Sequence, residues 1–324
     1  MRPTSVPTSA EFHRRAFLAA GLASLSATNA PAAAQPFFKR HGLPIGLQLY
    51  TLGPEAQVDL AATFGAVAAI GYRSVELPGL VLSRAAEVRA ALDRTGLVCP
   101  SVHVQPRGGP NDAAFNNDPG KLGEALNAIG VKTAVAPIFL IPERFDMKPK
   151  PGEDRGAVLR RLGAQMTLDD WKRNAESMND KARGLKASGI KVGYHNHNFE
   201  FAPLGDTNGF EILLKHTDPT LVSFELDVGW VAAAGVDPAK VFAHHKGRFT
   251  QMHVKDIKAT TKPNYVLSMD PTEVGSGALV WKTLLPAAYA AGVRGFYLEQ
   301  EPPFTMPRIA AAKVGYDYLA GVTA

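Results

Sequence analysis

The sequence predicts a single-domain (β/α)8 barrel, and three observations lead to this fold class. From residue 43 onward, eight short apolar runs alternate with longer amphipathic stretches, which is the order of βαβ units around a parallel sheet. Eight such units occupy about 280 residues, close to the roughly 250 residues of one closed barrel. Polar residues also gather where the apolar runs end, as they do at the functional face of such barrels. An open, doubly wound sheet with fewer strands is the alternative.

The apolar runs are the expected strands, because they have the length and the β-branched or aromatic content of buried strands. They span residues 45–50, 74–77, 98–104, 133–136, 191–197, 222–227, 250–254 and 295–299. Helices are expected between them, for example over residues 56–70, 168–188 and 281–291. A glycine follows each of these three stretches, and glycine commonly ends a helix because it adopts left-handed backbone angles without strain.

Two connections are unusually long, over residues 139–167 and 255–280. They follow the fourth and seventh expected strands, so a barrel would place both over its functional face. Long loops in compact domains are usually functional or disordered, and we expect these two to form a lid or a substrate wall. The second contains Gly275-Ser276-Gly277. This is not a dinucleotide-binding fingerprint, because it lacks the third glycine and does not directly follow a strand.

Composition excludes several classes of protein. The chain has 324 residues, of which 46% are hydrophobic and 20% charged, which is typical of a globular protein with a large core. Residues 1–34 carry three arginines against one glutamate, so the formal charge falls from +5 to +3 without them. Such a mild charge argues against a nucleic-acid partner. Cys99 is the only cysteine, which excludes an intrachain disulfide and a cysteine-based zinc site.

The first segment has the pattern of an export signal. Arg14-Arg15 precedes a short apolar run at 16–25, and small residues lead up to Ala34. Paired arginines in this context predict recognition by the twin-arginine export machinery, cleavage after residue 34 and a mature periplasmic barrel at 35–324. The alternative is a disordered, alanine-rich tail. No later segment has about 18 consecutive apolar residues, so no permanent membrane anchor is expected.

Nearly every expected strand carries, at or just beyond its end, a residue that can bind a metal or move a proton. These residues are Glu76, His103, His195, His197, Glu200, Asp227, His253, Lys255, Glu299 and Glu301. A charge at the end of a buried strand costs several kcal/mol unless it is paired or liganded. Taken singly, each has an ordinary structural explanation. Together they predict one divalent ion, Mn, Zn, Co or Mg, held by carboxylates and imidazoles with open positions for substrate.

The order of these motifs resembles the sugar phosphate isomerase/epimerase group of the xylose isomerase-like TIM barrels. The resemblance covers nearly all of residues 43–320. It is carried by the runs at 45–51 (IGLQLYT), 70–77 (IGYRSVEL), 193–201 (GYHNHNFEF), 225–230 (ELDVGW), 252–256 (MHVKD) and 297–299 (YLE). The resemblance implies one divalent ion held by Glu, Asp, His and Glu from strands five to eight. Asp227, His253 and Glu299 match the last three ligands.

The fifth strand departs from the family pattern, because His195-Asn196-His197 stands where many relatives have Glu-Asn-His. Either Glu200 supplies the missing carboxylate from the loop, or His195 ligates the ion directly. Side chains alternate along a strand, so His195 and His197 share one face. We favour Glu200 as the ligand, with the two histidines as acid/base or substrate-binding groups.

The opposite half of the mouth is expected to bind substrate. The candidates there, on strands one to three, are Gln48, Tyr50, Glu76 and His103. Trp230 and Lys255, just beyond strands six and seven, are further candidates for substrate binding. The alternative for most of them is ordinary packing inside the barrel.

The resemblance implies a small-molecule carbohydrate substrate and proton abstraction next to a carbonyl. We expect a sugar isomerase or epimerase acting through an enediolate on a keto-sugar or an oxidised glycoside, with Glu299, His195, His197 and Glu200 as catalytic candidates. A lyase or dehydratase that eliminates a β-substituent from a 3-keto-glycoside or an inosose-like compound is the first alternative. A catalytically idle, exported sugar-binding barrel is the second. A homo-oligomer is compatible with the sequence.

Overall fold

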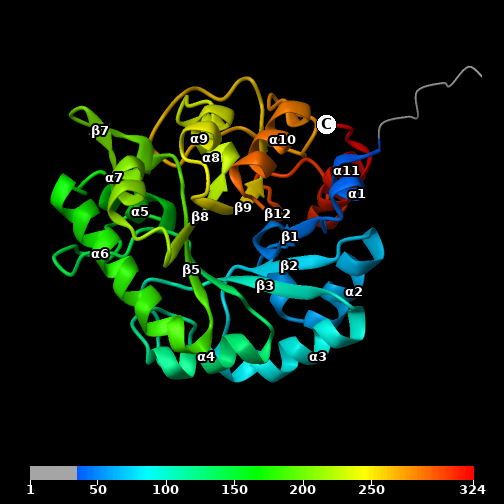
Figure 1. Cartoon of the computed structure of the whole chain (residues 1–324), viewed down its shortest axis with the longest axis horizontal. Coiled ribbons are helices and arrows are strands. Elements are labelled where there is room, and N and C mark those ends of the chain that lie inside the picture. Colours follow the sequence, from blue (N-terminus) through cyan, green and yellow to red (C-terminus); the bar gives the residue numbers. More distant parts are fainter. Residues whose placement is uncertain (1–34) are drawn as a thin grey trace, which may run out of the picture. The chain divides into compact units, whose positions relative to one another are not determined.

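Eight parallel strands close into a barrel in the part of the chain that the computed structural model describes, residues 35–324 (Figure 1). The expected export signal at 1–34 lies outside the described residues. The strands are β1 (Gly46–Gln48), β2 (Ser74–Leu77), β3 (Val98–His103), β4 (Thr133–Ala136), β5 (Lys191–His195), β8 (Val222–Asp227), β9 (Phe249–Val254) and β12 (Gly295–Leu298). They follow one another around the barrel in this order, and β12 pairs with β1 to close it. The predicted fold class is confirmed, and all eight expected strands are present.

Helices surround the strands in Figure 1. They are α1 (Phe37–His41), α2 (Leu60–Ile70), α3 (Ala85–Thr95), α4 (Pro119–Ala128), α5 (Arg155–Gly163), α6 (Leu168–Leu185), α7 (Gly209–His216), α8 (Val228–Ala233), α9 (Pro238–His244), α10 (Trp281–Ala291) and α11 (Arg308–Gly321). Short 3-10 turns are η1 (Leu49–Leu52), η2 (Pro54–Gln57), η3 (Leu82–Arg84), η4 (Lys186–Ser188) and η5 (Phe199–Phe201). Within the described chain, no helix is both long enough and apolar enough to cross a membrane.

Helix α6 shows how local sequence sets an element. It begins at a capping box, in which Thr167 Oγ1 accepts a hydrogen bond from the backbone N–H of Asp170 and the Asp170 carboxylate accepts one from the N–H of Thr167. Its buried stripe includes Trp171 and Met178, which pack against the barrel. The helical run ends at Gly189, whose φ of 70° lies in the left-handed region.

The interior of the barrel is polar, in contrast to the branched apolar layers that usually fill such barrels. The alternation of side chains along β8 shows how this polar interior arises. Phe224 points outward, where its ring meets Phe210 of α7 at 5.6 Å between centroids. Glu225 and Asp227, on the opposite face, point into the barrel and are at most 1% exposed. The strand register therefore carries two acidic side chains to the centre of the molecule.

The two long connections contain structure of their own. The first holds α5, and the second holds the antiparallel pair β10 (Asp256–Ile257) and β11 (Pro271–Thr272). A further two-stranded hairpin, β6 (Pro203–Leu204) and β7 (Thr207–Asn208), follows η5.

The glycine-rich turn in the second connection is bound to Asp256. The Asp256 carboxylate accepts hydrogen bonds from the backbone N–H groups of Gly275 and Gly277 and from Trp281 Nε1. A Cβ at Gly277 would clash with this carboxylate, so the residue must be glycine. In the described chain, the Gly275-Ser276-Gly277 motif therefore shapes a loop.

Candidate active site

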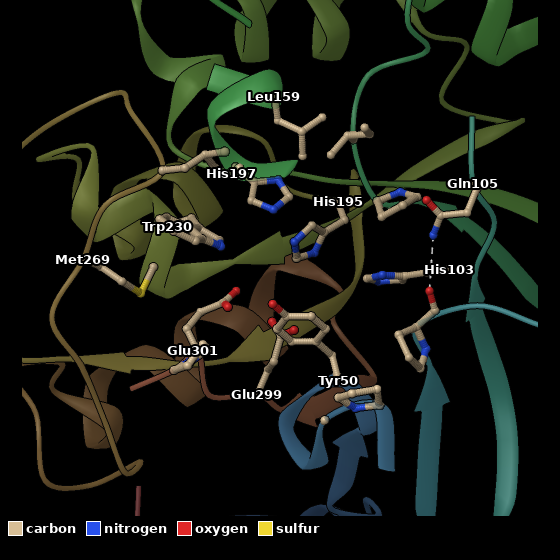
Figure 2. A pocket seen from close by; sticks show the side chains of 18 of the residues that line it. Tyr50, His103, Gln105, Leu159, His195, His197, Trp230, Met269, Glu299 and Glu301 are labelled. Atoms are coloured by element: carbon tan, nitrogen blue, oxygen red, sulfur yellow. Dashed lines mark hydrogen bonds between the residues drawn. The ribbon is translucent and has the colours of Figure 1, made fainter. Parts of the chain in front are cut away.

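A pocket of about 690 Å³ opens at the carboxyl end of the barrel strands. Both long connections contribute to its wall, as the sequence predicted, through Leu159 of α5 and Met269 (Figure 2). The polar side chains that line it are those of Tyr50, Gln57, His103, Gln105, Arg160, His195, His197, Ser268, Glu299, Glu301 and Arg308. Six of the predicted catalytic, metal-binding or substrate-binding residues therefore meet here, together with Glu301: Tyr50, His103, His195, His197, Trp230 and Glu299.

Asp227, His253 and Glu299 form a compact set of donors, which we call the mouth cluster. His253 Nδ1 lies 2.8 Å from Glu299 Oε2 and 3.6 Å from Asp227 Oδ2. These side chains are almost fully buried, at 0 to 5% exposure. The buried Asp227 Oδ2 has no well-aligned hydrogen bond with any described residue, and its close contact is the ion pair with Lys255 Nζ at 2.7 Å. Two carboxylates and one imidazole whose donor atoms lie close together fit a metal ion.

Lys255 places its ammonium between the carboxylates of the mouth cluster. Its Nζ lies 2.7 Å from Asp227 Oδ2, 2.8 Å from Glu299 Oε2 and 3.2 Å from Glu301 Oε1. Burial alone would lower the pKa of Lys255, but the three carboxylates outweigh it and hold that pKa well above its usual value. Lys255, which was predicted to contact substrate, is thus a buried counterion of these carboxylates. Its ammonium supplies positive charge at the place where a metal ion would otherwise supply it.

A second set of donors, which we call the deep cluster, shares His253 with the mouth cluster and adds His103, His195 and Glu225. Its carboxylate, Glu225, lies two residues before Asp227 on β8 and so one strand pleat further into the barrel. Glu225 Oε1 lies 3.1 Å from His103 Nε2, 3.2 Å from His195 Nδ1 and 2.9 Å from His253 Nε2. Electrostatic contact with the histidines overcomes the effect of burial and holds the pKa of Glu225 well below its usual range.

The buried polar side chains inside the barrel form a network of hydrogen bonds and ion pairs, which we call the interior network. The sequence analysis did not identify Glu225 and Gln251 as members of it. Glu225 precedes Asp227 by two residues, and Gln251 precedes His253 by two. Because side chains two apart on a strand share a face, this spacing was the signal that could have found them. Gln251 Nε2 donates to Glu225 Oε2 at 3.0 Å.

Gln48 and Glu76 belong to this interior network and are absent from the pocket lining. Gln48 Nε2 donates to Glu76 Oε2 at 2.8 Å, and the same oxygen lies 2.7 Å from His253 Nε2. Ser101 Oγ donates to the other carboxylate oxygen. Burial, followed by the nearby Glu225 carboxylate, raises the pKa of Glu76. The substrate-binding role predicted for Gln48 and Glu76 has no support in this placement.

Glu200, expected as the fifth-strand ligand and as a catalytic group, lies outside both clusters. Its oxygens accept hydrogen bonds from Tyr194 Oη at 2.7 Å and from the backbone N–H of His197 at 2.9 Å. Tyr194 alternates with His195 along β5 and faces away from the barrel centre, and the turn η5 brings Glu200 to that side. Burial raises the pKa of Glu200 to about 8. Of the two alternatives, the geometry supports His195, whose Nε2 lies 3.9 Å from Asp227 Oδ2.

Burial disfavours the charged form of His195, the last residue of β5, and of His197, which follows that strand. Burial, followed by the neighbouring His253, lowers the pKa of His195 to about 4. Burial also holds the pKa of His197 well below its usual value. The ring of His197 stacks on Phe199 at 5.4 Å, and its buried Nδ1 has no hydrogen-bond partner among the described residues. A neutral imidazole with a free ring nitrogen can accept or relay a proton.

Tyr50 and Trp230 line the pocket together with Glu299 and Glu301 (Figure 2). Tyr50 is 45% exposed, and the nearby carboxylate of Glu301, with partial burial, raises its pKa to about 12. Trp230 Nε1 is buried without a partner in the described part of the chain. Its ring lies 5.1 Å from Lys255 Nζ, a cation–π contact. These groups can bind the oxygens and the apolar face of a sugar-like ligand.

Sequence comparison finds relatives that cover part of this chain. An inosose dehydratase from Clostridium tetani is 33% identical over 92 residues, which are 28% of this chain and 30% of that protein. An inosose dehydratase from Geobacillus thermodenitrificans is 25% identical over 154 residues, 44% of this chain and 51% of that protein. The chain thus aligns with about half or less of the length of these relatives.

Solved structures match over most of the described chain. A sugar phosphate isomerase/epimerase from Parabacteroides distasonis superposes with a TM-score of 0.64 at 25% identity, covering 86% of this chain and 97% of that one. The 3-keto-D-glucoside 4-epimerase of E. coli superposes with a TM-score of 0.60 at 17% identity, covering 86% and 98%. The xylose isomerase-like TIM barrel model matches residues 64–320. With the closed barrel and the buried clusters at its mouth, this match shows that the chain belongs to the xylose isomerase-like TIM barrel family.

Proposed function

We propose that this protein is a divalent-metal-dependent isomerase or epimerase that removes a proton next to the carbonyl of a keto-sugar or an oxidised glycoside. The observation that carries the proposal is the mouth cluster, a set of buried carboxylate and imidazole donors that fits a metal ion, beside a polar pocket large enough for a sugar. A keto-sugar offers adjacent oxygens to such a site.

The ligands in this proposal are Asp227, His253 and Glu299, joined by His195. Bound there, a divalent ion would supply Lewis acidity that polarises a carbonyl and makes the neighbouring C–H group more acidic. The ligands hold the pocket in a fixed geometry. With an ion bound, Lys255 would leave its place between Asp227 and Glu299 and would pair with Glu301, whose Oε1 already lies 3.2 Å from its Nζ.

Proton transfer in this proposal belongs to His197 and Glu301. Both line the pocket, and neither is in the mouth cluster. They follow strands β5 and β12, which lie three positions apart in the ring of strands and so approach the pocket from different sides. An epimerase needs one proton acceptor and one donor on the two faces of the carbon. Burial raises the pKa of Glu301, and this direction favours a carboxyl group that can hold and release a proton.

Dehydration is the second candidate, and the sequence match to two inosose dehydratases favours it. It begins with the same proton abstraction, after which a β-hydroxyl leaves as water. His197 is the group at the pocket that can protonate a leaving oxygen. Product analysis separates the two reactions, because isomerisation conserves the mass of the substrate and dehydration lowers it by one water.

The test is solvent-deuterium exchange on a panel of free and glycosidic keto-sugars, with Mn²⁺ present, for the wild type, Asp227→Ala and the control Asp206→Asn. Asp206 is an exposed residue between β6 and β7. We expect deuterium at a carbon next to the carbonyl with the wild type and the control, and none with Asp227→Ala. If the wild type and both variants bound sugar but none catalysed deuterium exchange, the proposed enzymatic function would be refuted and a sugar-binding barrel would be favoured.

We propose further that the protein acts after export through the twin-arginine machinery, on carbohydrates outside the cytoplasm. The support is the paired arginines at 14 and 15 and the apolar run that follows. Cell fractionation of the wild type and of a variant with Arg14→Lys and Arg15→Lys tests this. Periplasmic recovery of both proteins in equal amounts would contradict it.

A further inference from the structure

We propose that Glu225 is a positioning residue that turns the imidazoles of His195 and His253 so that one nitrogen of each ring faces the mouth cluster as a metal ligand. The inference rests on the metal site of the proposed function and extends it to a residue that contacts neither the pocket nor the mouth cluster's carboxylates.

Each of the two rings connects the deep cluster with the mouth cluster. His195 places Nδ1 3.2 Å from Glu225 Oε1 and Nε2 3.9 Å from Asp227 Oδ2. His253 places Nε2 2.9 Å from Glu225 Oε1 and Nδ1 3.6 Å from Asp227 Oδ2. One carboxylate oxygen therefore contacts the inner nitrogen of both rings, while their outer nitrogens converge on one aspartate oxygen.

The chemistry of imidazole turns this geometry into a requirement. A neutral imidazole has one N–H donor and one nitrogen with a lone pair, and only the lone pair can bind a metal. A carboxylate accepts hydrogen bonds and cannot donate them, so the nitrogen that faces Glu225 must carry the hydrogen. For His195 the lone pair is then left on Nε2, the nitrogen on the side of Asp227. His253 Nδ1 faces two carboxylates, Glu299 Oε2 at 2.8 Å and Asp227 Oδ2 at 3.6 Å, so by the same reasoning it carries a hydrogen that a bound ion would replace. Carboxylate partners of this kind commonly orient metal-binding histidines.

Glu225 is itself held in place. It is 1% exposed, and its second oxygen accepts a hydrogen bond from Gln251 Nε2 at 3.0 Å. It lies two residues before Asp227 on β8, so one strand carries both a ligand and the group that orients two others. His103 adds a third imidazole nitrogen, 3.1 Å from the same oxygen.

The two rings differ in how much they depend on Glu225. His253 Nε2 has a second acceptor, Glu76 Oε2 at 2.7 Å. For His195 Nδ1, Glu225 is the carboxylate contact found within the described chain. Loss of the Glu225 carboxylate should therefore disturb His195 first and leave His253 largely oriented by Glu76.

The experiment uses Glu225→Gln, which keeps the shape of the side chain but replaces one acceptor oxygen with a donor. Nitrogen-15 NMR of histidine-labelled, metal-free protein reports directly which ring nitrogen carries the hydrogen. In the wild type we expect His195 as the Nδ1–H form, and in Glu225→Gln a mixture of both forms. Mn²⁺ affinity, measured by calorimetry, should fall about 10- to 100-fold in the variant.

Glu273→Gln is the matched control, because Glu273 is also buried but bonds to Gln300, Thr272 and Thr305 instead of histidines. It should change neither the His195 signal nor the Mn²⁺ affinity. Glu225→Asp, which retains a carboxylate, should restore part of both.

Several outcomes would overturn the inference. One is wild-type His195 in the Nε2–H form, a result that needs no variant to fold. Another is a Glu225→Gln protein with unchanged His195 signals and Mn²⁺ affinity. Two Mn²⁺ ions per wild-type chain and one in Glu225→Gln would show that the deep cluster binds an ion and that Glu225 is a ligand. If the wild type bound no divalent ion, the proposed function would fail, while the NMR measurement would still decide the role of Glu225.

Discussion

Replacing Lys255 with methionine should destabilise the metal-free protein strongly and the metal-loaded protein much less. Methionine keeps the apolar stem but removes the ammonium that lies 2.7 and 2.8 Å from Asp227 Oδ2 and Glu299 Oε2. Lys255 is 1% exposed, so the two carboxylates lose a buried counterion that water cannot readily replace. Removing one partner of a buried ion pair typically costs about 3–5 kcal/mol.

The assay is thermal unfolding followed by circular dichroism, with a chelator and then with MnCl2. A loss of this size should lower the Tm of the metal-free protein by roughly 6–20 °C. An ion at 100 times its Kd stabilises the folded state by about 2.7 kcal/mol, so Mn²⁺ should restore about half of the loss or more. Lys282→Met, on the exposed face of α10, is the control and should leave the Tm nearly unchanged. A metal-free Lys255→Met protein as stable as the wild type would refute the idea that the ammonium stands in for the ion's charge.

Three further predictions concern other parts of the site. Burial raises the pKa of Glu200 to about 8 from a usual value of 4.5, so between these values the folded state holds a proton that the unfolded state releases. The stability of the protein should therefore fall as the pH rises from about 5 to 8. Glu200→Gln should flatten that part of a curve of Tm against pH. A steeper fall in the variant would contradict this assignment. Gly277→Ala should lower the free energy of unfolding, measured with urea, by about 1–3 kcal/mol, because the added methyl group clashes with the Asp256 carboxylate. An unchanged urea midpoint would mean that the loop can move aside. Trp230→Phe should raise KM several-fold at nearly constant kcat, because it removes the unpartnered Nε1–H donor but keeps the ring; an unchanged KM would show that this donor does not contact substrate.

The fold could be predicted from the sequence because strand alternation and helix ends are local signals. The stretch at 281–291 is the helix α10, and its end at Gly292 has a positive φ of 115°, as the glycine suggested. The eight strands could be predicted because the apolar runs have the length of buried strands and are too short for most helices. The closed barrel was then the arrangement that buries eight parallel strands with helices on one side.

The candidate site was predictable only in part. Asp227, His253 and Glu299 are brought together because each lies within one residue of the end of its strand, and the three strands are neighbours in the barrel. Glu200 lies beyond the end of its strand, where the turn η5 changes the direction of the side chain, and alternation gives no guidance there. Lys255 followed the strand pattern into the barrel, but its pairing with two carboxylates depends on the spacing between β8, β9 and β12, which sequence does not encode locally.

The central claim is that His195, Asp227, His253 and Glu299 together hold a divalent ion at the mouth of the barrel. The most direct measurement is a crystal structure of the protein grown with Mn²⁺, in which anomalous scattering locates the ion without reference to activity. We predict one anomalous peak, with His195 Nε2, Asp227 Oδ2, His253 Nδ1 and Glu299 Oε2 as ligands and the Lys255 ammonium moved away toward Glu301. A fully loaded crystal with no peak at these atoms, and with Lys255 still between Asp227 and Glu299, would contradict the account.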